Sequence, residues 1–270
     1  MKKWLHILLA LLPVLSCVGQ KDDPVEPDPE PDPTPVVDPS GEGKDFFRRT
    51  LILDFTGTWC VNCPRMDAAI GAVMEDRPGR VVPVSVHCLS VDPMTVEPFS
   101  TSLQKRFGVS AWPSAVVDLD PESLITASSS ELLLSHMDRL LEARGTASGI
   151  RIESTLEDGT LTVKAGAKAV KDGEYTLGIL LLEDGVVAKQ TGAEDGDKHV
   201  HNNILRHWTD GEPATLKEGE TVELELTATI TGQYRIAALL CRAGLVDNVV
   251  TCAAGASVDY QYEEETNNSI

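Results

Sequence analysis

The hydrophobic pattern of the chain changes its period near the middle. In residues 45–146, short continuous apolar runs such as 50–55 and 81–86 alternate with apolar positions at helical spacing. This alternation predicts an α/β fold with a largely buried sheet. In residues 147–262, apolar and polar residues alternate along short segments that are separated by Asp-Gly turn signals. We therefore expect the second part to be an antiparallel β-sandwich of the immunoglobulin-like type.

Three helices are expected in the first part. The first ends at Pro78-Gly79, the second ends at Gly108, and the third begins after the cap candidates in residues 128–130. The first helix has five apolar residues whose spacing places them on one face, which is expected to be buried. They are Met66, Ala69, Ile70, Val73 and Met74. The length allows two modest domains, residues 45–146 and 147–262, and we expect residues 263–270 to be a flexible tail.

The N-terminal residues predict export. Two lysines precede an apolar run, Trp4 to Leu15, that is too short to span a bilayer, so residues 1–16 are expected to be a signal peptide. The run ends in Leu15-Ser16-Cys17, which resembles a bacterial lipobox. The resemblance implies cleavage before Cys17 and a lipid on that cysteine, which would attach the protein to the membrane. The alternative is an ordinary signal peptide with an incidental cysteine.

Residues 17–44 are expected to be a spacer. Proline alternates with Asp or Glu from Pro24 to Pro39, a composition typical of extended segments that bury no core. The preceding Gln20-Lys21-Asp22-Asp23 is similar to the acidic tag that directs lipoproteins of Bacteroidetes to the cell surface, or it only begins the acidic linker. The net charge of -19 argues against nucleic acid and anionic lipid surfaces as partners.

The strongest chemical signal is a C-x-x-C motif, Cys60-Val61-Asn62-Cys63, placed where a strand ends and an amphipathic helix begins. Unpaired N–H groups and a partial positive charge at a helix N-terminus stabilise a thiolate, here on Cys60. Cys63, one turn further, can then attack a mixed disulfide and release the product. Cys60 and Cys63 are the candidate nucleophile and resolving thiol, and they are expected to form a disulfide with each other.

This region resembles the thioredoxin superfamily. Asp54-Phe55 precedes the motif as in the thioredoxin strand, and Trp112-Pro113 occupies the place of the family's cis-proline. The resemblance implies thiol–disulfide exchange with extracytoplasmic protein thiols or disulfides, without a cofactor. It also implies that Asp54 moves the proton of the second cysteine and that Pro113, Trp59 and Trp112 contact the substrate.

Two alternatives and two departures qualify this resemblance. A carboxylate in an apolar strand should have a raised pKa, which suits proton transfer, but Asp54 could instead be a structural partner. Pro113 could be an ordinary trans proline at the start of a strand. Trp112 replaces a small or β-branched residue, and Val61-Asn62 replaces Gly-Pro, so the direction of the redox reaction stays open. The competing hypothesis is a surface binding or adhesion module in which the disulfide is a static staple.

The other cysteines and the histidines suggest further sites. Cys241 and Cys252 lie on neighbouring predicted strands, and a disulfide between them is one expectation for an exported protein. Cys88 is either a third redox thiol or a buried free cysteine. A zinc site using His87 is disfavoured because neighbouring strand residues point to opposite faces. The remaining histidines of interest, which are more typical of a surface than of a metal site, are His199, His201 and His207. We expect no metal.

The whole chain is also similar to the outer-membrane lipoproteins of Bacteroidetes named after a twenty-eight-kilodalton outer-membrane protein. The similarity rests on the lipobox, the T-W-C-x-x-C-P motif and two weaker C-terminal segments, residues 201–206 and 246–250. It implies a lipid-anchored protein of the outer membrane, exposed at the cell surface, and it supplies no substrate.

Overall fold

The computed structural model describes residues 44–264, which belong to one compact unit. The predicted signal peptide, Cys17, the spacer up to residue 43 and residues 265–270 lie outside the described residues. None of the helices within residues 44–264 has the length and hydrophobicity needed to cross a bilayer.

The fold is mostly β-sheet with few helices. The helices are α1 (Cys63–Asp76), α2 (Phe99–Phe107) and α3 (Ser130–Arg144), with short 3-10 turns η1 (Pro121–Ser123) and η2 (Gly196–Lys198). The strands of the first half are β1 (Thr50–Thr56), β2 (Val81–His87) and β3 (Ser114–Val117). Those of the second half are β4 (Gly149–Glu157), β5 (Thr160–Lys168), β6 (Gly173–Asp184), β7 (Val186–Ala188), β8 (His199–His201), β9 (Ile204–Asp210), β10 (Ala214–Leu216), β11 (Thr221–Thr229), β12 (Gln233–Arg242) and β13 (Leu245–Ala253).

One eight-stranded sheet runs through both halves of the chain. Its order is β13-β12-β6-β9-β2-β1-β3, with β10 paired to β6. The halves meet where β2 pairs in parallel with β9 through the single register pair Ser85 and Ile204. The backbone N–H of Ser85 donates to the carbonyl oxygen of Asn203 at 2.8 Å, and its hydroxyl donates to that of Asn202 at 3.1 Å. Strands from the two predicted domains are thus hydrogen-bonded into the same sheet.

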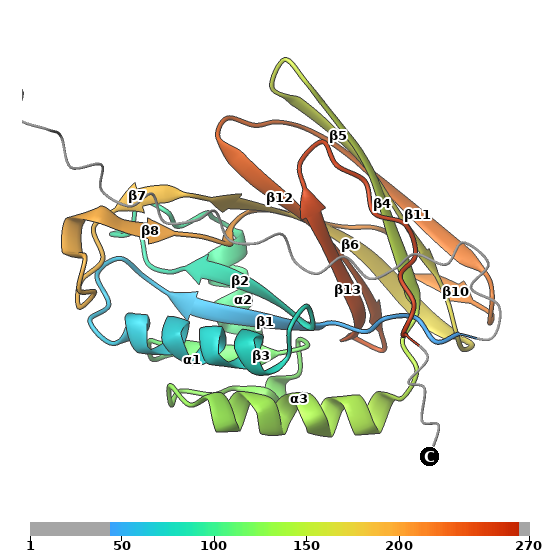
Figure 1. The fold of residues 1–270 in the computed structure, drawn as a ribbon, viewed down its shortest axis with the longest axis horizontal. Coiled ribbons are helices and arrows are strands. Elements are labelled where there is room, and N and C mark those ends of the chain that lie inside the picture. Colours follow the sequence, from blue (N-terminus) through green and yellow to red (C-terminus); the bar gives the residue numbers. More distant parts are fainter. Residues whose placement is uncertain (1–43, 265–270) are drawn as a thin grey trace, which may run out of the picture. The chain divides into compact units, whose positions relative to one another are not determined.

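Helices cover both faces of β1, β2 and β3. On one face α1 and α3 lie side by side, as Figure 1 shows, and their apolar residues pack with Ile52, Ala115 and Val117. On the other face the core combines α2 with strands of both halves, including Leu53, Leu103, Phe107, Leu180, Leu205, Leu239 and Val249. This shared core explains why the two halves form one unit, because neither half covers its apolar surface alone.

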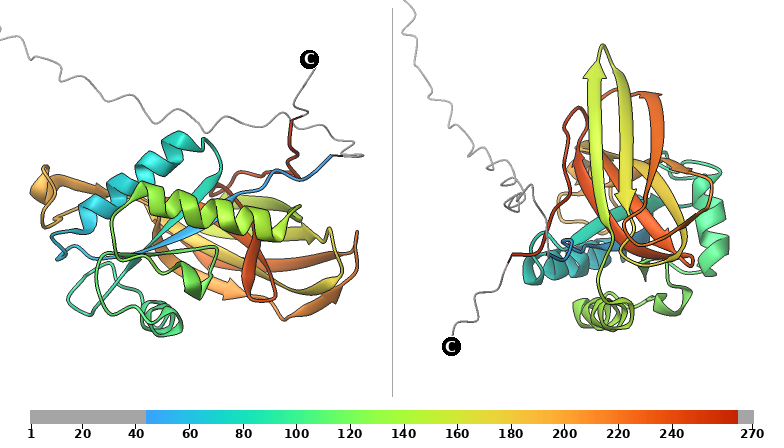
Figure 2. Two further views of the ribbon diagram at one scale, coloured as in Figure 1. Left: turned by 90° about the horizontal axis from the view of Figure 1, so that it is seen from below. Right: turned by 90° about the vertical axis from the view of Figure 1, so that its right-hand side faces the viewer.

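The second sheet has three strands in the order β11-β5-β4. It packs against β6 and β12 of the large sheet, as seen in the right-hand view of Figure 2, through a core that includes Ile152, Val163, Ile179, Ile236 and Ala238. Strands β4 and β5 are joined by Asp158-Gly159, both with positive φ, as the Asp-Gly signal predicts. Alternating burial along β5 confirms the expected period of two.

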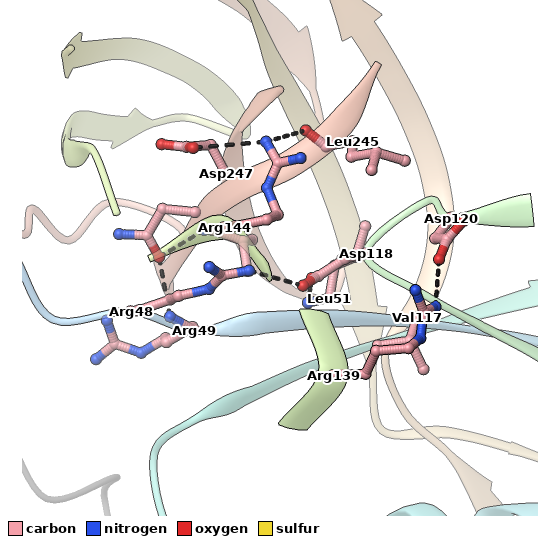
Figure 3. A network of polar contacts seen from close by, with 12 residues as sticks. Arg48, Arg49, Leu51, Val117, Asp118, Asp120, Arg139, Arg144, Leu245 and Asp247 are labelled. Atoms are coloured by element: carbon pink, nitrogen blue, oxygen red, sulfur yellow. Dashed lines mark hydrogen bonds and ion pairs between the residues drawn. The ribbon is translucent and has the colours of Figure 1, made fainter. Parts of the chain in front are cut away.

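A buried network of charged residues links the first half to the end of β12 and the start of β13 (Figure 3). Arg48 pairs with Asp118 at 3.2 Å, and the backbone N–H of Leu51 donates to the other carboxylate oxygen of Asp118 at 2.8 Å. Arg144, at the end of α3, lies 3.5 Å from Asp247. Asp118 and Asp247 are almost completely buried, so burial raises the pKa of Asp118 to about 6 despite the neighbouring Arg48.

Glu263, the first residue of the predicted flexible tail, is held in the structure. Its backbone N–H donates to the carbonyl oxygen of Asp45 at 2.8 Å, and its carboxylate accepts two hydrogen bonds from Arg80 at 2.5 and 2.6 Å. The C-terminal segment therefore runs beside the residues that precede β1.

The expected disulfide between Cys241 and Cys252 is wrong, because both thiols are free. The register of the β12–β13 hairpin explains this. Cys241 is opposite Val246, whereas Cys252 is opposite Ile236, five residues away along β12. At the rise of a β-strand, about 3.3 Å per residue, this offset is far beyond the reach of a disulfide.

Candidate functional site

The C-x-x-C motif lies at the junction of β1 and α1. Cys60 is in the connecting loop, Cys63 is the first residue of α1, and a disulfide joins them with 5.5 Å between their Cα atoms. Pro64 occupies the first turn of the helix, where its missing N–H costs nothing. The disulfide is therefore placed against the positive end of the α1 dipole, which is the position that favours a thiolate on reduction.

The loop that carries Cys60 is fixed by backbone hydrogen bonds. The N–H of Cys60 donates to the carbonyl oxygen of Gly57 at 2.9 Å. The N–H of Thr58 donates to a carboxylate oxygen of Asp92 at 2.7 Å. Gly57 must lack a side chain here, since an added Cβ would lie 2.5 Å from the indole nitrogen of Trp59. The loop is thus held rigidly between β1 and the segment after β2.

Two tryptophans and a proline adjoin the motif. The peptide bond between Trp112 and Pro113 is cis, which confirms the sequence expectation. Trp59 and Trp112 pack edge to face with 5.5 Å between ring centroids, and the indole N–H of Trp59 donates to the carbonyl oxygen of Cys88 at 3.1 Å. Trp59 and Trp112, two of the residues expected to contact a substrate, are therefore in contact with each other next to the motif.

A segment from the second half lies directly on the motif. We call residues 190–192, which follow β7, the cover segment. The side-chain amide of Gln190 donates to the carbonyl oxygens of Cys60 at 2.9 Å and Gly57 at 3.2 Å. The backbone N–H of Thr191 donates to the carbonyl oxygen of Thr58 at 2.8 Å. Cys60 is only 4% exposed, so the first cysteine of the motif is largely shielded from solvent.

Gly192 explains how the cover segment approaches so closely. Its φ is +87°, and a Cβ at this position would lie 2.2 Å from the carbonyl oxygen of Val61. Only glycine fits both the backbone conformation and the contact. The side chain of Val61, by contrast, is 60% exposed and leaves an apolar surface beside the disulfide.

Asp54 is buried in β1 and faces a pocket of about 250 Å³ beside α1. Burial raises the pKa of Asp54 well above its usual value, and the carboxyl group of Asp67 raises it further. Neither carboxyl oxygen of Asp54 has an ordinary hydrogen-bond partner among residues 44–264. These properties agree with the raised pKa expected from the sequence, and they disfavour the alternative that Asp54 is a paired structural carboxylate.

Three histidines line the same pocket, and all three are oriented by neighbours. His87 contacts a carboxylate oxygen of Asp92 through Nδ1 at 2.9 Å. The ring of His201 packs edge-on with those of His87 and His199, with centroids 5.4 and 4.8 Å apart. Burial, followed by the charges of His87 and His199, lowers the pKa of His201 to about 4, so its ring is neutral at pH 7.

The other predicted site residues do not join this site. Cys88 is fully buried, its thiol donates to the carbonyl oxygen of Val86 at 3.2 Å, and burial raises its pKa to about 11. It is therefore a buried free cysteine and not a redox thiol. His207 instead contacts the hydroxyl of Thr209. Within residues 44–264, no three His, Cys, Asp or Glu side chains are arranged to hold a metal ion.

Sequence reasoning missed Gln190, Asp67 and Asp92. The spacing of Cys63, Asp67 and Ile70 at i, i+4 and i+7 places Asp67 beside the buried face of α1 and could have indicated it. Gln190 and Asp92 gave no local signal, because each reaches the motif from a segment distant in the sequence.

Comparison with known proteins supports the fold. No protein family and no curated protein matches the chain in sequence. Among solved structures, HBP35 of Porphyromonas gingivalis is similar with a TM-score of 0.65 and 16% identity, over 82% of this chain and 80% of that one. Protein AGR_C_4864 from Agrobacterium tumefaciens has a TM-score of 0.54 and 16% identity, over 79% of this chain and 97% of that one. At such low identity the likeness shows that the chain shares a fold, comprising both halves, with a protein of P. gingivalis.

Proposed function

We propose that this protein is a thiol–disulfide oxidoreductase of the cell envelope, built from a thioredoxin-like part and an antiparallel β-sandwich part. The observation that carries the proposal is the disulfide at the N-terminus of α1, together with the buried Asp54 of the preceding strand, whose pKa is raised. Disulfide exchange needs a stabilised thiolate and a group that takes up or supplies a proton. Cys60 is the nucleophile, Cys63 the resolving thiol and Asp54 the proton acceptor. Trp59, Trp112 and Pro113 form the substrate platform.

The substrates of this reaction would be extracytoplasmic protein thiols or disulfides. The lipobox-like sequence that ends in Cys17 and the acidic residues after it support a lipid anchor in the outer membrane, with the folded part at the cell surface. A lipid on Cys17 is tested by metabolic labelling with a fatty acid. Labelling of the wild-type protein that persists after Cys17→Ser substitution would rule out this anchor.

The test of the redox proposal is the reduction potential of the Cys60–Cys63 pair. The full-length protein, purified from membranes in detergent, is equilibrated in graded thiol buffers, and free thiols are counted by mass spectrometry. A reversible transition between about −270 and −120 mV is expected of a catalytic exchanger. Cys60→Ser should abolish exchange of a model protein disulfide. Cys252→Ser, which removes a free thiol on β13, is the matched control and should change neither result.

A second candidate function rests on the shielding of Cys60. Because the cover segment leaves this residue only 4% exposed, the disulfide could serve as a static staple in a binding or adhesion module. That function predicts a bridge that resists reduction below about −300 mV. It also predicts that Cys60→Ser lowers stability without removing any exchange activity.

A further inference from the structure

The pocket beside Asp54 is also lined by titratable side chains to which the proposed exchange reaction gives no role. Its walls come from β1, α1, β2 and β8, which lie around the left-hand end of the large sheet in Figure 1. The titratable residues that line it are Asp54, Asp67, His87, His199 and His201. A volume of about 250 Å³ with several polar side chains in its lining is ample for several water molecules.

Two buried side chains in this pocket have unused hydrogen-bonding atoms. Asp54 is 2% exposed and His201 is 7% exposed. Both carboxyl oxygens of Asp54 and Nε2 of His201 have no partner among the described residues. A buried polar atom without a partner destabilises the folded state, because its hydrogen bonds to water are lost and not replaced. Side chains that keep such atoms at a pocket are expected to exchange hydrogen bonds or protons with what enters it.

Asp67 connects Asp54 to solvent. It is on α1, one turn after Cys63, and stands at the exposed mouth of the pocket. Burial raises the pKa of Asp67, although the neighbouring carboxyl group of Asp54 and the charges of His199 and His87 oppose the rise. Asp67 in turn raises the pKa of Asp54. The carboxyl group of Asp67 therefore favours the protonated form of Asp54.

We propose that Asp54 and Asp67 share one proton, and that Asp67 is a positioning residue that passes this proton between the pocket and Asp54 during disulfide exchange. This inference rests on the proposed redox function. It extends that function by giving the buried carboxyl group a route to solvent through the pocket that Asp54 and Asp67 line.

In the proposed reaction, the Cys60–Cys63 disulfide oxidises a substrate dithiol. A thiolate of a substrate dithiol attacks Sγ of Cys60, and the electron pair of the broken Cys60–Cys63 bond stays on Sγ of Cys63. This thiolate takes the proton of Asp54, which is replaced through Asp67 from the pocket. The second substrate thiolate attacks the substrate sulfur of the mixed disulfide, and Cys60 leaves as a thiolate. The substrate is oxidised by two electrons, and the reverse sequence reduces it.

The other titratable groups around Asp54 and Asp67 influence the pH at which these two carboxyl groups ionise. From β2, His87 faces the pocket and is tied to Asp92, whose pKa is raised by burial but lowered overall by its hydrogen bonds to His87 and to backbone N–H groups. From β8, His199 contacts Asp195 outside the pocket lining, and His201 is neutral at pH 7. Behind the sheet, the thiol of Cys88 is neutral as well. Asp67 is thus the other carboxyl group among the residues that line the pocket with Asp54.

The test is an infrared difference titration of the protonated carboxyl band in the oxidised full-length protein. Asp54→Asn assigns the band. With Asp67→Asn, removal of the neighbouring charge should lower the titration midpoint of Asp54 by about one pH unit, a tenfold loss of proton affinity. Asp67→Glu should restore it. Glu75→Gln, an exposed residue of the same helix, is the matched control and should leave the midpoint unchanged.

Activity is measured in parallel as the rate of dithiol oxidation against pH. The Asp67→Asn profile should shift toward acid together with the infrared midpoint. An active Asp67→Asn protein with unshifted midpoint and profile would overturn the shared proton but leave the redox function standing. A wild-type protein that exchanges no disulfides at any pH would overturn the redox function and the relay together, even if the infrared midpoint shifts.

Discussion

The side-chain amide of Gln190 donates a hydrogen bond to the carbonyl oxygen of Cys60 at 2.9 Å. Gln190 is itself only 3% exposed, and it belongs to the half of the chain that the sequence assigns to a separate β-sandwich. The first cysteine of the motif is therefore positioned by both halves. The contacts of Gln190, Gly192, Asp118 and Asp247 can each be tested by substitution.

Removal of the Gln190 amide should loosen the loop around Cys60. Gln190→Leu keeps a similar volume but removes hydrogen bonds to three carbonyl oxygens, those of Gly57, Cys60 and Thr191. At about 1 kcal/mol for each bond, the melting temperature should fall and the disulfide should be reduced by dithiothreitol several-fold faster. Gln104→Leu, which removes an amide that bonds within α2, is the control and should not change the reduction rate. Equal reduction rates in wild type and Gln190→Leu would show that the amide does not hold the loop.

A side chain at residue 192 should lift the cover segment from the motif. In Gly192→Val the Cβ would meet the carbonyl oxygen of Val61, and the positive φ adds strain. We expect faster alkylation of Cys60 in the reduced protein. Gly196→Val is the matched control, because Gly196 also has positive φ but has open space around its Cβ position. If both variants alkylate at the same rate, the cover segment does not limit access to Cys60.

Asp118 should make stability fall as pH rises through weakly acidic values. Its pKa is about 6 in the folded protein and about 3.8 in the unfolded chain, so the folded state binds more protons in this interval. Ionisation of Asp118 should therefore cost about 3 kcal/mol between pH 3.8 and 6. Asp118→Asn keeps an acceptor for Arg48 and Leu51 and should remove this slope from denaturant unfolding measured at each pH. A slope that persists unchanged in the variant would assign it to other groups.

Asp247 should be the most sensitive residue of the network in Figure 3. It accepts hydrogen bonds from Arg242 at 3.0 Å and from the backbone N–H of Ser148 at 2.9 Å, and it pairs with Arg144. Asp247→Ala leaves two guanidinium groups without their carboxylate and should cost about 3–5 kcal/mol in urea unfolding.

The control for Asp247 is Asp138→Ala, which removes the partner of Arg77 from an exposed ion pair. It should change stability by less than about 1 kcal/mol. Similar losses in the two variants would mean that the buried network does not join the halves energetically.

Local sequence signals predicted local structure well. The serine cap before α3 is present, with the hydroxyl of Ser129 accepting from the N–H of Leu132. The C-terminal glycine of α2 is Gly108, with positive φ. The C-x-x-C disulfide, the cis proline and the buried Asp54 were all located from patterns within a few residues. Each of these features depends on short-range steric or hydrogen-bonding preferences, which the sequence displays directly.

Local sequence signals did not predict the contacts between segments that are distant in the sequence. A single register pair, Ser85 with Ile204, joins the sheet across the halves, and one pair leaves no periodic pattern to detect. The separation of Cys241 from Cys252 depends on the register of the β12–β13 hairpin, in which Cys252 is opposite Ile236. The function of Gln190 depends on where the chain returns after β7. Tertiary geometry decides all three.

The shared sheet also bears on how such a protein can change during evolution. A gene fragment ending between α3 and β4 would encode β2 without the strand β9 on its outer side, and would expose the apolar residues that Leu180, Leu205 and Leu239 normally cover. Such a product would be prone to aggregate rather than act as a small redox protein. Recombination can thus exchange the folded part intact more readily than either half, and any selection on the Cys60–Cys63 disulfide extends to residues of the second half such as Gln190.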